Sequence, residues 1–526
     1  MSIFATRISV DDLVSALGDG SEMALIDARE QGAYSDSHLL FAVNVPRSRV
    51  ELRSPRLIPR RDTRIVVVDT GGGEADDVAR SLTTLGWTDV AVLDGGNDAW
   101  AAAGHELYSG VNVPSKLFGE LVEHHYGTPH VKPAELRSWI DEGRKMVILD
   151  SRTHREYRRM SIPTGRSCPG GELVSRVFDL IDEDTTVVVN CAGRTRSILG
   201  AQSLRNAGLT NEVVALENGT MGWELAGLQL DHDAREVAPL PTAEGREIAA
   251  AAAADVRARF GVATIGREEA EQWLADARRT TYLLDVRTPD EYEAAHLLGS
   301  VSAPGGQLVQ ATDEYMATRN SRVIVVDDDG TRASTSASWL LQMGWEVAVL
   351  SDGLSGGTLA HGPERSEDLV DIPSVAMVDV GGVGDALIID VASSTDHRRA
   401  HIPGSVWAVR GRLADCAGRN LDPDRVVITS PEGLLGALAH AEAAAAWPGA
   451  DVAVLRGGTA AWRGAGLPVE TGLDTDEPVD DVWALPYDPG DDKVAKDAMQ
   501  GYLTWEVDLV DQYDRDPLVD FPLPTV

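Results

Sequence analysis

Residues 187–197 read VVVNCAGRTRS, an apolar run followed by a cysteine, a glycine and two arginines. The apolar run predicts a buried β-strand, and residues 197–204 predict a helix. Cys191 would then lie in the turn between the two. The amide groups of a helix start, together with Arg194 and Arg196, favour the thiolate of a cysteine, which is its reactive form. The stretch therefore predicts a reactive thiol at the end of a strand.

The surrounding pattern recurs, so that the chain contains four copies of one unit. Each copy begins with an apolar strand that ends in an aspartate: Asp27, Asp150, Asp285 and Asp390. A second apolar strand follows about forty residues later, within residues 65–68, 187–189, 323–326 and 426–428. A helix and a third strand come next, and the third strand ends in a glycine-rich turn, as at residues 90–96 and 452–458. In three copies a tryptophan follows that turn: Trp100, Trp223 and Trp462.

Only the second copy carries a cysteine after its second strand. In the other copies we expect Thr70, Asp328 and Ser430 at that place. Apolar runs that alternate with helices predict an α/β fold, in which a mostly parallel sheet has helices on both faces. Reactive groups of such sheets lie at the carboxyl ends of the strands, where Cys191 is expected. The copies thus predict one reactive site on a scaffold that is repeated four times.

The strand–Asp-x-Arg, strand–Cys-loop and Gly-Gly-x-x-x-Trp elements together resemble rhodanese domains, the fold of thiosulfate and mercaptopyruvate sulfurtransferases. The resemblance covers nearly the whole chain up to about residue 470, and the arrangement is similar to bacterial sulfurtransferases built from four tandem rhodanese modules. It implies an α/β protein of four tandem rhodanese-like domains with a C-terminal helical tail. From the repeated elements we place these domains at residues 1–108, 128–230, 260–363 and 369–471. A connecting helix is expected at residues 246–259.

The remaining residues, 472–526, form an acidic C-terminal extension. Apolar residues at helical spacing, among them Tyr502, Leu503 and Trp505, predict an amphipathic helix within it. Such a helix docks its apolar side either on the body of the chain or on a second subunit. The sequence does not decide between these two surfaces. A homo-oligomer that forms through this helix is therefore one of the two alternatives.

A thiolate can accept a sulfane sulfur and give it up again through a persulfide, which loop amides at a helix start would stabilise. The resemblance implies that Cys191 is the catalytic residue of a sulfurtransferase. Our hypothesis is that Cys191 attacks the outer sulfur of thiosulfate, sulfite leaves, and a thiol or cyanide acceptor collects the sulfur. Arg194 and Arg196 would attract this small anionic donor. The residues predicted to bind the substrate follow the cysteine: Ala192, Gly193, Arg194, Thr195, Arg196 and Ser197.

Other functions compete with this hypothesis. One alternative is a 3-mercaptopyruvate sulfurtransferase or a persulfide carrier, and one of another class is a non-catalytic sulfur sensor or interaction scaffold.

Phosphate chemistry is a further competitor. Protein tyrosine phosphatases use a Cys-x5-Arg loop, whereas this chain has Cys-x4-Arg with Ser197 in place of the arginine. Residues 327–331 match the Asp-x-Asp-Gly-Thr opening of haloacid-dehalogenase-type phosphohydrolases. They fall where a rhodanese copy places its catalytic loop, which favours coincidence.

The composition limits the partners and the compartment. A net charge of −36 argues against nucleic acid and against an anionic membrane surface as partners. No apolar stretch is long enough to span a bilayer. Three cysteines among 526 residues cannot form a disulfide framework, which favours a reducing compartment, by default the cytoplasm. Because no His/Cys cluster has zinc spacing, we expect no metal, and we expect no cofactor.

Several other residues are interpreted as structural. Arg29, Arg152 and Arg287 occur in copies with and without the cysteine and are expected to form ion pairs, with Glu30, Glu156 or Glu291 as partners. The recurring histidines and tryptophans are assigned to packing for the same reason. Cys168 is expected in the core, and the match of residues 416–419 to the active loop is interpreted as chance because these residues precede their strand.

Overall fold

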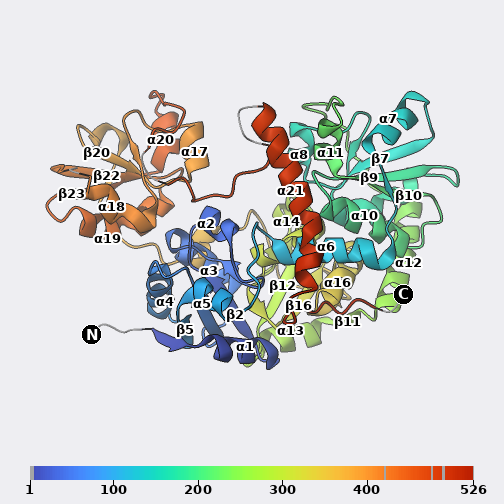
Figure 1. Cartoon of the computed structure of the whole chain (residues 1–526), viewed down its shortest axis with the longest axis horizontal. Coiled ribbons are helices and arrows are strands. Elements are labelled where there is room, and N and C mark those ends of the chain that lie inside the picture. Colours follow the sequence, from blue (N-terminus) through green and yellow to red (C-terminus); the bar gives the residue numbers. More distant parts are fainter. Residues whose placement is uncertain (1–4, 420–421, 476–477, 488–491, 525–526) are drawn as a thin grey trace.

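The computed structural model describes residues 5–419, 422–475, 478–487 and 492–524. Four α/β modules follow one another along the chain (Figure 1), and each contains a sheet of parallel strands. In the second module one face of the sheet packs against α9, α10 and α12, and the other packs against α7 and α11. The predicted fold class, four tandem modules of this kind with a C-terminal helix, is confirmed.

The first two modules share one strand order. In the first module it is β1-β5-β4-β2 with β3 beside β2, and in the second it is β6-β10-β9-β7-β8. The strands are β1 (Thr6–Ile8), β2 (Met23–Asp27), β3 (Val43–Asn44), β4 (Arg64–Val68), β5 (Val90–Leu93), β6 (His130–Val131), β7 (Met146–Asp150), β8 (Arg166–Ser167), β9 (Thr186–Asn190) and β10 (Val213–Leu216). The helices are α1 (Val10–Gly18), α2 (Gln31–Asp36), α3 (Val50–Leu57), α4 (Glu74–Thr84), α5 (Gly96–Ala102), α7 (Pro133–Asp141), α8 (His154–Arg159), α9 (Leu173–Arg176), α10 (Thr195–Asn206) and α11 (Gly219–Leu225).

The last two modules repeat this order as β11-β17-β16-β12-β14 and β19-β23-β22-β20-β21. Their strands are β11 (Ala263–Ile265), β12 (Thr281–Asp285), β14 (Val301–Ser302), β16 (Arg322–Val326), β17 (Glu346–Leu350), β19 (Met377–Val378), β20 (Leu387–Asp390), β21 (Val406–Trp407), β22 (Arg425–Thr429) and β23 (Asp451–Leu455), with a separate pair β13 (His296–Leu297) and β18 (Leu359–Ala360). The helices are α13 (Arg267–Ala275), α14 (Pro289–Ala294), α15 (Gly305–Gln310), α16 (Thr331–Gln342), α17 (Ser394–Arg399), α18 (Leu413–Ala417), α19 (Leu434–Ala446) and α20 (Gly458–Gly464).

Contacts between modules are extensive. The strand β15 (Thr318–Arg319) of the third module pairs antiparallel with β2, so it extends the sheet of the first module. The connecting helix α12 (Ala243–Phe260), which the sequence predicts, packs against both α9 and α16 and joins the second module to the third. The fourth module, at the upper left of Figure 1, contacts the first through ion pairs of Arg410 with Glu51. Three modules therefore share packed surfaces, while the fourth is attached at one side.

The C-terminal helix α21 (Asp492–Tyr513) docks within the same chain. It packs against the linker helix α6 (Val113–Tyr126) and against α11 of the second module (Figure 1). Met499, Leu503 and Leu509 bury their side chains in these contacts. Of the two docking surfaces that the sequence leaves open, the body of the chain is therefore the one occupied.

The strand-end aspartates hold the arginines that the sequence singles out. Asp27, Asp150 and Asp285 each lie 2.6 Å from Nη2 of the arginine two residues later, namely Arg29, Arg152 and Arg287. The expected ion pairs exist, but the expected glutamate partners are wrong. Because the arginine follows two residues after the aspartate, the carboxylate binds both its guanidinium and its backbone amide. Glu156 instead pairs with Arg196, and Glu291 pairs with Arg332. In the fourth module, Nδ1 of His397 takes the place of the arginine, 2.7 Å from Asp390 Oδ2.

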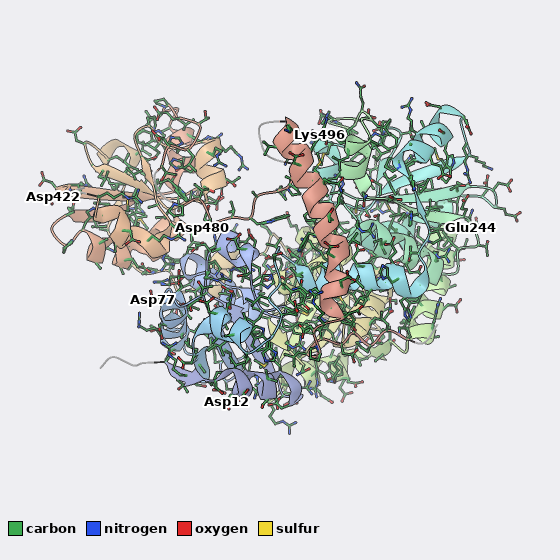
Figure 2. All side chains as sticks on the ribbon, viewed as in Figure 1. Asp12, Asp77, Glu244, Asp422, Asp480 and Lys496 are labelled. Carbon is green, nitrogen blue, oxygen red and sulfur yellow. The ribbon has the colours of Figure 1, made fainter. Side chains whose placement is uncertain are left out.

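The acidic excess lies on the surface. Figure 2 shows Asp12, Asp77, Glu244 and Asp422, all exposed, on separate parts of the molecule. Among the described residues, no helix combines the length and the apolar character needed to cross a bilayer.

Candidate active site

The strand register decides which residues occupy equivalent positions in the four modules. The strand-end aspartate pairs with the last residue of the second strand: Asp27 with Val68, Asp150 with Asn190, Asp285 with Val326, and Asp390 with Thr429. The next residue in each module is therefore Asp69, Cys191, Asp327 or Ser430. The sequence predicts Thr70 and Asp328 at the cysteine position, and both predictions are wrong by one residue. The apolar run alone does not determine which residue ends the strand. Ser430 is placed correctly.

In the first and third modules a carboxylate occupies the loop in place of a thiol. Asp69 accepts hydrogen bonds from the amides of Gly71 at 2.7 Å, Gly73 at 3.0 Å and Ala75 at 3.1 Å. The Asp327 carboxylate in the third module does the same with three loop amides: Gly330 at 2.6 Å, Arg332 at 2.8 Å and Ala333 at 3.1 Å. A loop whose amides converge on one negatively charged group is an anion-binding turn. The two modules thus show which kind of group this turn stabilises.

The second module keeps the same turn around Cys191. The thiol donates to Ser197 Oγ at 3.4 Å, and the Ser197 amide hydrogen-bonds to the sulfur. In all four modules the amide six residues after this equivalent position contacts it, and these amides belong to Ala75, Ser197, Ala333 and Gly436. Within the described part of the chain, the amides of residues 192–196 have no acceptor. They remain available to an anion beside the sulfur.

The glycine-rich turn after the third strand fixes the back of this loop. Gly219 has a φ of +55°, and a Cβ built there would collide with the carbonyl oxygen of Cys191. The Thr220 amide donates to that same oxygen at 2.9 Å. Only glycine allows so close an approach with a left-handed backbone. Gly219, which follows Asn218 here, therefore lets the turn contact the cysteine loop and hold the Cys191 backbone in place.

Burial keeps the cysteine protonated in the resting state. Cys191 is 2% exposed, and this burial raises the pKa of its thiol above the ordinary value. The charge of Arg196 and the hydrogen bonds of Ser197 oppose the shift but do not cancel it. The loop sequence contains the stabilising groups and therefore predicts a favoured thiolate. In the structure the loss of water outweighs them.

The two arginines of the loop are already paired with carboxylates. Arg194 Nε and Nη2 each donate at 2.7 Å to Glu120 on the linker helix, and Nη2 also contacts Glu123. Arg196 donates to both oxygens of Glu156, at 2.8 and 2.9 Å. The charge of Arg196 acts on the Cys191 thiol, but this arginine is already paired with Glu156. That these arginines bind the donor remains a prediction, and the unpaired amides offer the more accessible contacts.

The cysteine lines a cavity of about 160 Å³ that extends well beyond its own module. The linker region, the third module and the C-terminal extension all contribute to its lining: Lys116, Gln310, Trp483, Tyr487, Tyr502 and Glu506. The sequence predicts a docking helix from the apolar spacing around Tyr502, but it contains no signal for where that helix docks. Burial lowers the pKa of Lys116 to about 8, and its Nζ lies 5.0–5.2 Å from the ring centroids of three aromatic residues.

Gly193 is needed for space. A Cβ at this position would come within 3.0 Å of Met221 Cε and 3.1 Å of Glu506 Oε2. A side chain there would push α21 away from the loop, so the glycine allows the extension to close the cavity.

The remaining candidates do not join this site. Cys168 is buried in the core of the second module, where burial raises the pKa of its thiol, and Cys416 lies in the core of the fourth. Asp327, Asp328 and Asp329 could together reach one metal ion, but Asp327 already binds the loop amides and Asp328 pairs with Arg332. These contacts support the interpretation of the phosphohydrolase-like motif as coincidence.

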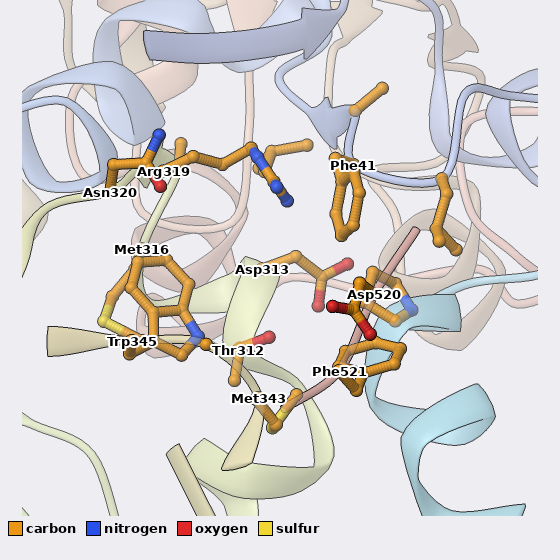
Figure 3. A pocket seen from close by; sticks show the side chains of 16 residues that line it. Phe41, Thr312, Asp313, Met316, Arg319, Asn320, Met343, Trp345, Asp520 and Phe521 are labelled. Carbon is orange, nitrogen blue, oxygen red and sulfur yellow. The ribbon is translucent and has the colours of Figure 1, made fainter. Parts of the chain in front are cut away.

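A larger cavity of about 250 Å³ lies between the first and third modules (Figure 3). Phe41, Asp313, Arg319 and Phe521 line it, and Cys191 does not. Asn112 connects the two cavities, because it lines the smaller one and donates to Asp313 at 3.2 Å. The larger cavity therefore neighbours the cysteine site but does not contain it.

Comparison with known proteins agrees with this geometry. The Rhodanese-like domain family matches residues 9–103, 132–226, 267–360 and 377–465. The chain belongs to the rhodanese family. A crystal structure of thiosulfate sulfurtransferase from Pseudomonas aeruginosa has a TM-score of 0.95 and 45% sequence identity, covering 99% of this chain and 100% of that chain.

Two curated relatives match over less than a fifth of this chain. The probable adenylyltransferase/sulfurtransferase MoeZ of Mycobacterium tuberculosis is 29% identical over 98 residues, which are 18% of this chain and 24% of that protein. The HTH-type transcriptional regulator Rv0324 of the same species is 32% identical over 94 residues, which are 18% of this chain and 41% of that protein. The chain thus covers less than half the length of either relative.

Replacing Asp69 tests the anion-binding turn in a module without the cysteine. Asp69→Ala leaves three loop amides without an acceptor, and we expect it to destabilise the first module by about 1–3 kcal/mol. Hydrogen exchange of residues 64–84, measured by mass spectrometry, should become faster. The exposed Asp62→Ala should leave that exchange unchanged. Equal exchange in both variants would contradict the assigned role of the turn.

The raised pKa of Cys191 predicts a steep pH dependence of its reactivity. Because the thiol form prevails at neutral pH, alkylation by iodoacetamide should accelerate about tenfold per pH unit from pH 7 to 8.5. Peptide mass spectrometry assigns the label to Cys191. Arg196→Gln removes an opposing charge and should slow the reaction further at each pH. A rate that levels off below pH 8 is incompatible with the raised pKa.

Proposed function

We propose that the chain is a thiosulfate sulfurtransferase with one active site, at Cys191. The observation that carries the proposal is that, of the four equivalent positions, this one alone has a thiol in the anion-binding turn. The whole-length likeness to a thiosulfate sulfurtransferase supports the same function. Carboxylates and a serine take that position in the other three modules, so these act as scaffold, and the third also lines the cavity through Gln310.

The chemistry divides into two transfers. In the first, the Cys191 thiolate attacks the outer sulfur of thiosulfate, the S–S bond of thiosulfate breaks, and sulfite leaves with the bonding electron pair. The Cys191 persulfide that forms carries a negative charge on its outer sulfur. Loop amides at residues 192–196, which lack acceptors among the described residues, would stabilise this charge. In the second transfer, a thiol or cyanide takes the outer sulfur and Cys191 is regenerated.

Sulfur uptake tests the proposal. After incubation with thiosulfate, the intact mass should increase by one sulfur atom, with one sulfite released per chain and turnover upon addition of cyanide. Cys191→Ser should lose both signals, whereas Cys416→Ala, which removes a core cysteine of another module, should retain them.

The other outcomes separate the alternatives. Turnover with 3-mercaptopyruvate alone would assign that donor in place of thiosulfate. A stable sulfur adduct that no acceptor discharges would favour a sensor over an enzyme. If the wild-type protein gains no sulfur from either donor, the proposed function is wrong.

A further inference from the structure

The cavity beside Cys191 contains a carboxylate oxygen that lacks a hydrogen-bond donor. Glu506 on α21 is only 1% exposed. Its Oε1 accepts a hydrogen bond from Thr195 Oγ1 at 2.7 Å, whereas Oε2 has no partner among the described residues. Burying a charged oxygen without a donor costs free energy. Because Glu506 lines the same cavity as Cys191, a ligand bound there can supply the missing donor.

We propose that Glu506 binds the positively charged end of the sulfur acceptor, so that the preferred acceptor is a small thiol carrying an ammonium group. This inference rests on the proposed function and adds to it the class of the second substrate. It also assigns a role to the C-terminal extension, which lies outside the residues that match the rhodanese family.

The nearby cations make their hydrogen bonds and ion pairs with other groups, which leaves Oε2 of Glu506 without a donor. Arg194 pairs with Glu120 and Glu123, and Arg196 pairs with Glu156. Lys116 donates to the carbonyl oxygen of Val111 at 2.5 Å and lies over aromatic rings of the extension. The charge of Glu506 acts on Lys116 and Arg194, but in the described part of the chain none of the three cations forms a direct ion pair with it. An ammonium group donates to a carboxylate with a charge-assisted hydrogen bond, the strongest kind available here.

The size of the cavity restricts the acceptor to a small molecule. Its volume of about 160 Å³ admits a molecule of on the order of ten non-hydrogen atoms, since one water alone requires about 10–15 Å³. Trp483 and Tyr487 of the extension form part of its wall. Gly193, two residues after Cys191, lets Glu506 approach the loop: a Cβ there would lie 3.1 Å from Oε2. An acceptor held by Glu506 therefore has its sulfur close to the cysteine.

The second transfer then proceeds without any further reactant. The acceptor thiol gives up its proton and its sulfur attacks the outer sulfur of the Cys191 persulfide. A new S–S bond forms on the acceptor, and the bond between Cys191 Sγ and the outer sulfur breaks. The electron pair of the broken bond stays on Cys191 Sγ, which takes up the proton. The acceptor leaves as a persulfide anion, while its ammonium group remains bonded to Glu506 throughout.

Discharge of the preloaded protein tests the inference. The protein is loaded with thiosulfate, desalted, and mixed with one of three thiols of similar size: cysteamine, which is cationic, 2-mercaptoethanol, which is neutral, and 3-mercaptopropionate, which is anionic. Intact mass then follows the loss of the added sulfur. Each thiol is compared between wild type and Glu506→Gln, so that differences in intrinsic thiol reactivity cancel. We expect Glu506→Gln to slow discharge by cysteamine at least tenfold, to change 2-mercaptoethanol less than twofold, and to accelerate 3-mercaptopropionate.

Two further variants separate binding from general damage. Asp508→Asn removes an exposed carboxylate from the same helix and should leave all three rates unchanged. Glu506→Asp keeps the charge and should restore part of the cysteamine rate. An equal slowing of all three thiols in Glu506→Gln, or no effect on cysteamine, would overturn the inference. Failure of the wild type to load sulfur would instead refute the proposed function.

Discussion

A turn whose backbone amides face the residue that follows the second strand is repeated in the four modules, and the rest of the site depends on it. The amide six residues further along the chain contacts this residue in every module, whether the residue is Asp, Cys or Ser. Two of the modules fill the turn with a carboxylate and so satisfy its amides permanently. The second module replaces the carboxylate by a thiol, which is neutral at rest and becomes an anion only when it reacts. The same backbone therefore serves as a closed scaffold in two modules and, under the proposed function, as the reactive centre in one.

The surroundings of Cys191 include segments from outside its own module. The carboxylates that pair with Arg194 come from the linker helix, and those that line the cavity come from α8 and α21. Gln310 of the third module and the aromatic residues of the C-terminal extension complete the lining. An isolated second module would lack these walls and would expose the loop to water. Exposure would lower the cost of ionising the thiol but would also leave a persulfide open to hydrolysis.

The sequence predicts the local elements better than it predicts their partners. The four apolar repeats predict the modules, and the cysteine loop is followed by α10, as its spacing indicates. The equivalent residues Asp69 and Asp327 are missed by one position, since strand pairing, and not the length of the apolar run, determines where a strand ends. The partners of Arg194 and the position of α21 depend on contacts between segments far apart along the chain, for which one sequence contains no signal. The pKa of Cys191 is missed for a related reason, because burial is a property of the whole assembly.

The most direct test of the central claim is a crystal structure of the protein after treatment with thiosulfate. The account predicts one additional sulfur on Cys191, with its outer atom within hydrogen-bonding distance of the amides of residues 192–197. The turns that hold Asp69 and Asp327 should be unchanged. An unmodified Cys191, or an added sulfur that points away from the loop amides, would contradict it.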